Sequence, residues 1–241
     1  MSQNPGVELK VLTSGILKQP LRELVPRFEN AHACTVKVSW GPSSGNSPES
    51  NVVRVRNGEA CDLLLMVSTG LDKLIDEGRL RGTTRRDIAT SEIGVAVRSD
   101  HLALDVSSVS ALRRCLLDAE SVGYSEGASG SYVGGRLFQA LGIEAELACK
   151  SRVILGRKFV GEAVAQGEVE IGIQQISELR LVPGITILGP LPAEVQHVSL
   201  VCGVIPANAR HPELAGELLE FLGSGAADDA LARAGLCRPR R

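Results

Sequence analysis

Short runs of β-branched and aliphatic residues alternate with amphipathic helical patterns along most of this 241-residue chain. Such alternation is typical of α/β proteins, in which helices pack against mainly parallel sheets. The runs that predict strands cover residues 8–13, 35–40, 62–67, 93–98, 121–124, 151–155, 171–173 and 198–204. We therefore expect an α/β fold with mainly parallel sheets.

The segments between these runs carry the spacing of helical faces. Leu21, Leu24, Val25 and Phe28 follow the i, i+3, i+4, i+7 pattern, so one face of a helix can bury them. Pro26 interrupts this pattern and should kink the helix locally, because it removes one backbone donor. Similar apolar spacing with a glycine end signal predicts helices over residues 71–78, 131–142, 159–167 and 214–223. Two further helices are expected over residues 109–117 and 227–234.

No internal repeat or low-complexity linker divides the chain. Two lobes would therefore be joined by structured crossings. We expect lobe one to comprise residues 1–88 and 195–241, and lobe two residues 89–194. The strands predicted at 93–98 and 198–204 would lie just beyond the crossings and let the lobes hinge.

Composition narrows the classes of partner. The chain has 26 basic and 28 acidic residues, for a net charge of −2, so no overall field attracts nucleic acid or an anionic membrane. One Trp, two Tyr and four Phe leave few platforms on which bases could stack. No apolar run approaches the ~20 residues that span a bilayer, so no membrane insertion is expected. Any anion binding would have to come from local groups.

The cysteines indicate whether a metal site is expected, and the N-terminal residues indicate where in the cell the protein is expected. Six cysteines lie far apart without a C-x-x-C or Cys/His cluster, so we expect mostly buried free thiols and no zinc site. Nothing in the sequence requires a metal or an organic cofactor. Residues 1–6 lack a basic segment followed by an apolar one, which predicts a cytoplasmic protein as the sequence stands. If an export signal has been removed from the chain, the expected location is the periplasm.

Three loops that follow predicted strands are rich in hydroxyl-bearing and small residues. They cover residues 13–16, 41–47 and 125–131. Each loop alone is most simply a turn or a helix cap. Ligands of open α/β sheets, however, bind beyond the carboxyl ends of the strands, where backbone N–H groups point outward. We therefore expect the three loops to converge on a small anion from both sides of a cleft.

Several segments, in order along nearly the whole chain, resemble one known family. They are residues 12–15, 43–44, 57–65, 130–136, 141–143, 172–173 and 183–185. Together they are similar to the molybdate-binding family of type 2 periplasmic solute-binding proteins, which has aconitate-isomerase-like members. The resemblance implies a two-lobed periplasmic-binding-protein-like fold with a central cleft and a hinge. It also implies an ABC transporter as a partner if the protein is exported.

The resemblance further implies which residues hold the ligand. In that family, hydroxyls after the first two strands and N–H groups of the second lobe bind a tetrahedral oxyanion. Carried over by position, these are Ser14, Gly15, Ser43 or Ser44, Ser129, Gly130 and the turn near Gly156. Gln175 stands where many molybdate sites have a Tyr, which is a departure from the family pattern.

A second departure is positive charge near the predicted site. Lys18 follows the first loop, and Arg157 and Lys158 follow the strand predicted at 151–155. A guanidinium binds carboxylates through two parallel hydrogen bonds, so a small polycarboxylate is the alternative to molybdate. The simpler interpretation of Arg157 and Lys158 is that they are solvated charges at a helix start.

These alternatives leave two functions open. The first is an anion-binding module, as in solute-binding proteins. The second is an isomerase that shifts a proton on a tricarboxylate, as in aconitate isomerisation, with Arg157, Lys158 and Ser14 as a clamp. Glu126 or His197 would then move the proton. The motifs of hydrolases, kinases and dehydrogenases are absent from the sequence.

Overall fold

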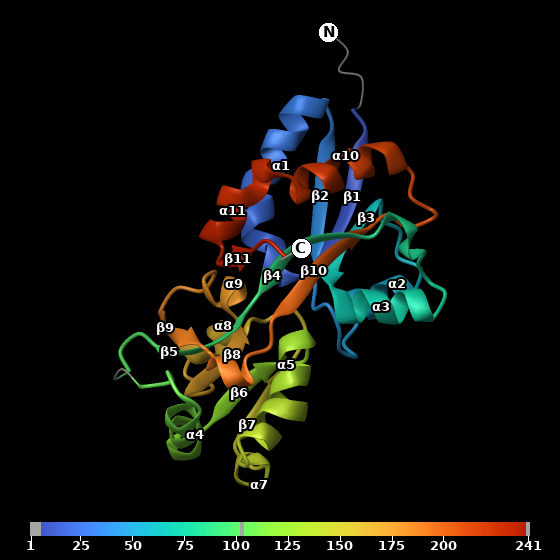
Figure 1. Ribbon diagram of the computed structural model, residues 1–241. Coiled ribbons are helices and arrows are strands. Elements are labelled where there is room, and N and C mark those ends of the chain that lie inside the picture. Colours follow the sequence, from blue (N-terminus) through green and yellow to red (C-terminus); the bar gives the residue numbers. More distant parts are fainter. Residues whose placement is uncertain (1–5, 102–103, 240–241) are drawn as a thin grey trace.

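The computed structural model describes residues 6–101 and 104–239 and has two lobes, each built on one β-sheet covered by helices (Figure 1). The sheet of lobe one contains β1 (Glu8–Thr13), β2 (Thr35–Trp40), β3 (Leu63–Val67), β4 (Arg86–Ser91), β10 (Ser199–Val204) and β11 (Leu236–Cys237), in the spatial order β11-β4-β10-β3-β1-β2. The sheet of lobe two contains β5 (Ile93–Arg98), β6 (Val122–Ser125), β7 (Ser151–Ile154), β8 (Ile171–Gln175) and β9 (Ile185–Pro190), in the order β7-β6-β8-β5-β9.

Each sheet is parallel on one side and antiparallel on the other. β1 pairs in parallel with β2 and β3, and β6 pairs in parallel with β7 and β8. By contrast, β10 is antiparallel to β3 and β4, and β5 is antiparallel to β8 and β9. The two-lobed α/β fold is confirmed, but the sheets are mixed rather than mainly parallel. The antiparallel strands are those that carry the chain from one lobe to the other and back.

Helices cover both faces of each sheet. In lobe one they are α1 (Lys18–His32), preceded by the 3-10 turn η1 (Gly15–Leu17), α2 (Asn51–Arg56), α3 (Ser68–Asp76), α10 (Pro212–Gly223) and α11 (Asp228–Arg233). In lobe two they are α4 (Val109–Asp118), α5 (Ala128–Tyr132), the π-helical turn η3 (Val133–Leu137), α6 (Phe138–Ala140), α7 (Glu144–Leu147), α8 (Val160–Ala165) and α9 (Ile176–Leu179). The helix α1 continues through Pro26 to its end.

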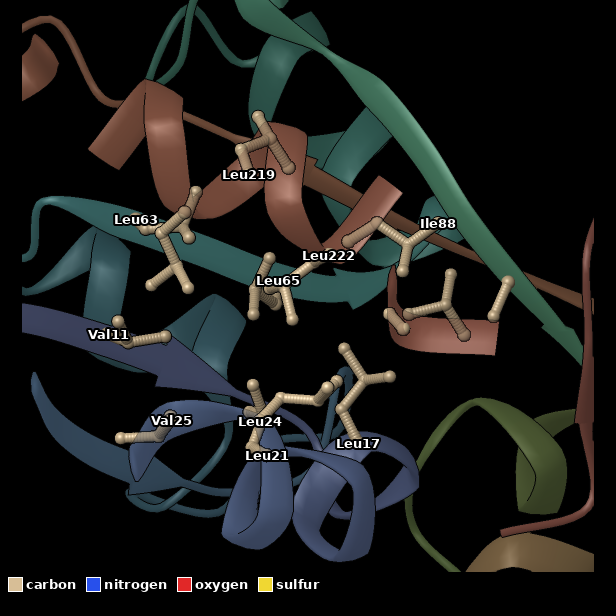
Figure 2. Close-up of a cluster of buried hydrophobic side chains, with 14 of the residues drawn as sticks. Val11, Leu17, Leu21, Leu24, Val25, Leu63, Leu65, Ile88, Leu219 and Leu222 are labelled. Atoms are coloured by element: carbon tan, nitrogen blue, oxygen red, sulfur yellow. The ribbon is translucent and has the colours of Figure 1, made fainter. Parts of the chain in front are cut away.

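Each lobe has its own hydrophobic core. Figure 2 shows Leu21 and Leu24 of α1 facing Val11 of β1 and Leu65 of β3, with Leu222 of α10 beside them. Burying one such leucine completely contributes about 1.5–3 kcal/mol, so the apolar stripe of α1 holds that helix firmly on the sheet. A separate cluster around β5, β6 and β8 fills lobe two. Because the cores are separate, the lobes can move as two bodies.

The chain crosses between the lobes twice. The first crossing is Glu92, which lies between β4 and β5, and the second covers residues 191–198, between β9 and β10. β4 therefore lies wholly in lobe one, although the boundary expected from the sequence fell inside it. Gln196 joins the crossings, because its Oε1 accepts the N–H of Ile93 at 3.1 Å and its Nε2 donates to the carbonyl of Ile93 at 3.0 Å. The two crossings thus behave as one hinge.

Two expectations from composition can be compared with the structure. Within the described residues, no helix combines the length and apolar character needed to cross a membrane. All six cysteines are free, but only Cys61, Cys115 and Cys202 are buried, whereas Cys149 and Cys237 are exposed.

Candidate functional site

A cavity of about 30 Å³ lies between the two lobes, at the ends of strands from both sheets. Lobe one lines it through the loops that follow β1 and β2. Lobe two lines it through the start of α5, the turn after β7 and the segment from β8 into α9. The polar and aromatic residues of the lining are Ser14, Trp40, Ser43, Ser125, Ser129, Arg157, Lys158, Phe159, Gln174, Gln175 and Glu178.

Two buried hydroxyls form the wall from lobe one. Ser14 is 2% exposed, and its hydroxyl has no hydrogen-bond partner among the described residues. Ser43 is 4% exposed, and its Oγ accepts the N–H of Val67 at 3.2 Å, which leaves its own proton to donate. A buried hydroxyl without a partner costs free energy, so both groups are well placed to donate to a ligand.

Asn51 holds the two loops of lobe one in place. Its Nδ2 donates to the carbonyls of Thr13 at 2.8 Å and Gly41 at 3.3 Å, so it ties the end of β1 to the end of β2. Arg54 donates to the Oδ1 of Asn51 at 3.2 Å and is itself paired with Glu59. This buried network fixes the hydroxyls before any ligand arrives. The sequence analysis missed Asn51, because only the fold brings these residues together.

The wall from lobe two contains a hydroxyl and an amide. Ser129, which is 3% exposed, lies near the start of the helical run 128–140, with its Oγ 3.3 Å from the Oγ of Ser125. Gln175 is 1% exposed, and its Nε2 donates to the Oγ of Ser199 at 2.8 Å, while its Oε1 has no partner in the described part of the chain. The Ser199 hydroxyl can also donate, so the amide can turn and present its N–H₂ group to an anion.

Glu178 is the acidic group of the cavity. It lies on α9 just after β8, half-buried, with its carboxyl against Gly15 of lobe one. Burial raises the pKa of the carboxyl to about 7, and a hydrogen bond from Gln174 opposes part of that rise. Gln174 is oriented by Val160, whose N–H donates to its Oε1 at 2.8 Å. Glu178 therefore gains and loses a proton near neutral pH.

The lobes are in close contact at Gly15. A Cβ at this position would lie 2.7 Å from Cε1 of Phe159 and would also overlap the carboxyl of Glu178. Next to this contact, Trp40 of lobe one stacks on Phe159 of lobe two, with ring centroids 4.9 Å apart. The Nζ of Lys18 lies 3.9 Å from the centroid of the Trp40 ring. A glycine at position 15 is thus what lets the two lobes close.

The cationic side chains in and near the cavity differ in whether an acidic side chain already pairs with them. Arg157 is exposed at the cavity and forms no ion pair with any described residue. Lys158 donates to Glu168 at 2.5 Å and to Gln166 at 2.9 Å, so its charge is already balanced within lobe two. Burial, and then the charges of Arg22 and Arg157, lower the pKa of Lys18. Arg157 is the cation most available to an anionic ligand.

Five residues singled out from the sequence do not line the cavity, among them Lys18, which lies beside the ring of Trp40. Ser44 belongs to the loop of Ser43, and Gly130 packs against the backbone of Ser125, where no Cβ fits. Glu126 accepts hydrogen bonds from three backbone N–H groups. His197 lies in the second crossing with its ring stacked on Tyr132 at 4.8 Å, and burial lowers its pKa. The acid that does line the cavity, Glu178, has no motif around it in the sequence.

Comparison with known proteins agrees with the two-lobed fold. The family model described as bacterial extracellular solute-binding protein matches residues 9–236. An aconitate isomerase from Pseudomonas sp. is 36% identical over 236 residues, which cover 98% of this chain and 90% of that protein. Among solved structures, the periplasmic molybdate-binding protein of Azotobacter vinelandii has a TM-score of 0.75 at 18% identity, covering 96% of this chain and 100% of its own. A periplasmic thiamin-binding protein has a TM-score of 0.72 at 13% identity, covering 100% of this chain and 86% of its own. At these identities the solved structures show the fold alone.

Proposed function

The chain belongs to the family of bacterial extracellular solute-binding proteins, and we propose that its interlobe cavity binds a small polycarboxylate and shifts one of its protons, as in aconitate isomerisation. Binding of a small ligand between the lobes is what the family and the cavity have in common. The observation that carries the finer proposal is Glu178, a carboxyl inside the cavity with a pKa of about 7.

A site that only retains an anion gains nothing from such a group. When Glu178 is ionised, its charge repels a bound anion, and no cation among the described residues pairs with it. A proton-transfer site, by contrast, needs an acid whose pKa is close to the working pH, so that it can both take and return a proton. The 36% identity to an aconitate isomerase supports the second interpretation.

The proposed reaction is an allylic proton shift. Glu178 removes a proton from the methylene carbon of the substrate, and the electron pair of that C–H bond forms a new carbon–carbon double bond as the former double bond breaks. The same proton returns to the carbon that was vinylic, so nothing is oxidised or reduced. The charge that develops in between spreads onto a substrate carboxylate, where the hydroxyls of Ser14, Ser43 and Ser129 can donate hydrogen bonds. Arg157 would bind a second carboxylate at the edge of the cavity.

The experiment that tests this proposal follows trans-aconitate by ¹H NMR in the presence of the protein. We expect cis-aconitate to form, and we expect both isomers to raise the melting temperature, because a ligand specific to the folded state stabilises it. The control is the same mixture without protein. If no cis isomer forms, the proposed isomerisation is wrong, and if in addition neither isomer raises the melting temperature, the proposed binding of a polycarboxylate is wrong as well.

A second candidate rests on the neutral donors. The buried hydroxyls of Ser14, Ser43 and Ser129 would suit a tetrahedral oxyanion such as molybdate, delivered to an ABC transporter without reaction. In the same melting experiment, stabilisation by molybdate but by neither aconitate would favour this second candidate.

A further inference from the structure

The carboxylate of Glu126 joins the two lobes at a second place, outside the cavity. Its Oε2 accepts the N–H groups of Asn46 and Ser47, both at 3.2 Å, from the loop of lobe one that also carries Ser43. Its Oε1 accepts the N–H of Gly156 at 2.7 Å, in the turn of lobe two that leads into Arg157. One carboxylate therefore fixes both a hydroxyl-bearing loop and the turn that bears the free cation.

We propose that Glu126 is a positioning residue that holds the lobes together around the substrate, and that it does not itself move the proton. This inference rests on the proposed function. Both oxygens of the carboxylate are engaged by N–H donors, and the residue is absent from the cavity lining. Hydrogen bonds to an ionised acceptor are roughly twice as strong as neutral ones, so the two from Asn46 and Ser47 make a substantial contact between the lobes, and the one from Gly156 holds the carboxylate in place within lobe two.

The backbone around Glu126 is shaped for this contact. Gly45 has a φ of +112°, and a Cβ there would lie 2.6 Å from the Oε2 of Glu126, so the loop passes directly over the carboxylate. Gly156 has a φ of +66°, a left-handed conformation that turns its N–H toward Oε1. A glycine on each side of the carboxylate, one from each lobe, permits the close approach.

The proposal predicts a particular kinetic change. Losing the contact lowers the fraction of molecules with closed lobes, and the apparent affinity for the substrate falls in proportion to that fraction. Saturating substrate still drives the lobes to close. In Glu126→Gln, we expect the KM for trans-aconitate to rise about tenfold with kcat nearly unchanged, because the amide has no charge to strengthen these hydrogen bonds and keeps only one of the two acceptor oxygens. Gly45→Ala, which obstructs the same contact, should likewise raise KM and leave kcat nearly unchanged. Glu120→Gln, an exposed acid of lobe two, is the matched control.

A second measurement needs no substrate. Trp40 is the single tryptophan of the chain and is stacked on Phe159 across the lobes, so opening exposes it to solvent. We expect iodide to quench the fluorescence of Glu126→Gln more strongly than that of the wild type or of Glu120→Gln.

The outcomes separate this proposal from the proposed function. Equal quenching in Glu126→Gln and the wild type overturns the positioning role, whether or not the protein isomerises aconitate. A loss of kcat with unchanged KM also overturns it, because that would place Glu126 in the chemistry. If the wild type forms no cis-aconitate while quenching rises as expected, the positioning role holds and the isomerase is wrong.

Discussion

The carboxylates of Glu178 and Glu126 both lie where the lobes meet, and their surroundings give them opposite properties. Glu178 is enclosed with one side-chain donor, Gln174, and burial raises its pKa to about 7. Burial alone would also raise the pKa of Glu126, but hydrogen bonds from Ser47, Gly156 and Asn46 hold it below the ordinary value. The same side chain is therefore a proton carrier in one place and a permanent charge in the other. The number of N–H donors, more than burial, decides which.

The largest expected effect is a loss of kcat when Glu178, but not Glu126, is replaced. In Glu178→Gln the group that moves the proton is lost, so kcat for trans-aconitate should fall by a factor of roughly 10² to 10⁴. Steady-state kinetics would measure it, with Glu120→Gln, an exposed acid of lobe two, as the control. A kcat within a few-fold of the wild type would show that Glu178 is not the proton carrier.

The next effect is on the pH dependence of the rate. A base must be ionised to accept a proton, and Glu178 is ionised only above its pKa of about 7. We expect kcat/KM to be constant above that pH and to fall below it, approaching about tenfold per pH unit. Glu126→Gln should keep this profile, because Glu126 is ionised throughout the range. A rate that is independent of pH between 5 and 8 would contradict the role given to Glu178.

The smallest effect concerns stability, where the two acids should differ in sign. The pKa of Glu178 is raised from 4.5 to about 7 in the folded protein, so the free energy of unfolding falls as pH rises between these values, by on the order of 3 kcal/mol in total. The pKa of Glu126 is lowered, so its contribution is present above its ordinary value of 4.5 and is lost as pH falls through the folded-state pKa.

Melting temperatures of the two Gln variants, each relative to the wild type, would test this contrast. Raising the pH from 4.5 to 8 should favour Glu178→Gln relative to the wild type, because the Glu178 contribution changes between these values. For Glu126→Gln the window lies lower, and raising the pH from about 3 to about 5 should disfavour this variant relative to the wild type. A shift of the same sign in both variants would contradict the comparison.

Much of the fold could be predicted from the sequence, because its strands and helices carry clear periodicity. The strands β4, β9 and β11 were missed for physical reasons. β4 begins with two charged residues, β9 is only partly buried and ends in Gly189 and Pro190, and β11 has two residues. These three strands pair with their neighbours in antiparallel fashion. Because they were missed, mainly parallel sheets were expected from the sequence.

The candidate site could be predicted in part. Three serines, Ser14, Ser43 and Ser129, follow predicted strands in the sequence. Ligands of open α/β sheets bind where the loops at the carboxyl ends of the strands meet, so a shared cavity could be expected from the sequence. All three serines line the cavity in the structure. The role of an acid depends instead on its neighbours in space. Gln174 and Gly15 determine the properties of Glu178, and Gly15 is far from it along the chain. The amides around Glu126 likewise come from two lobes.

The side chain of Gln196 binds both the N–H and the carbonyl of Ile93, so the two crossings between the lobes are fastened together at one point. We expect such a joint to restrict the lobes to rotation about it, with little twisting or sliding. Ser14 and Glu178 would then return to the same relative position whenever the lobes close, and little entropy would be lost in reaching the reactive arrangement.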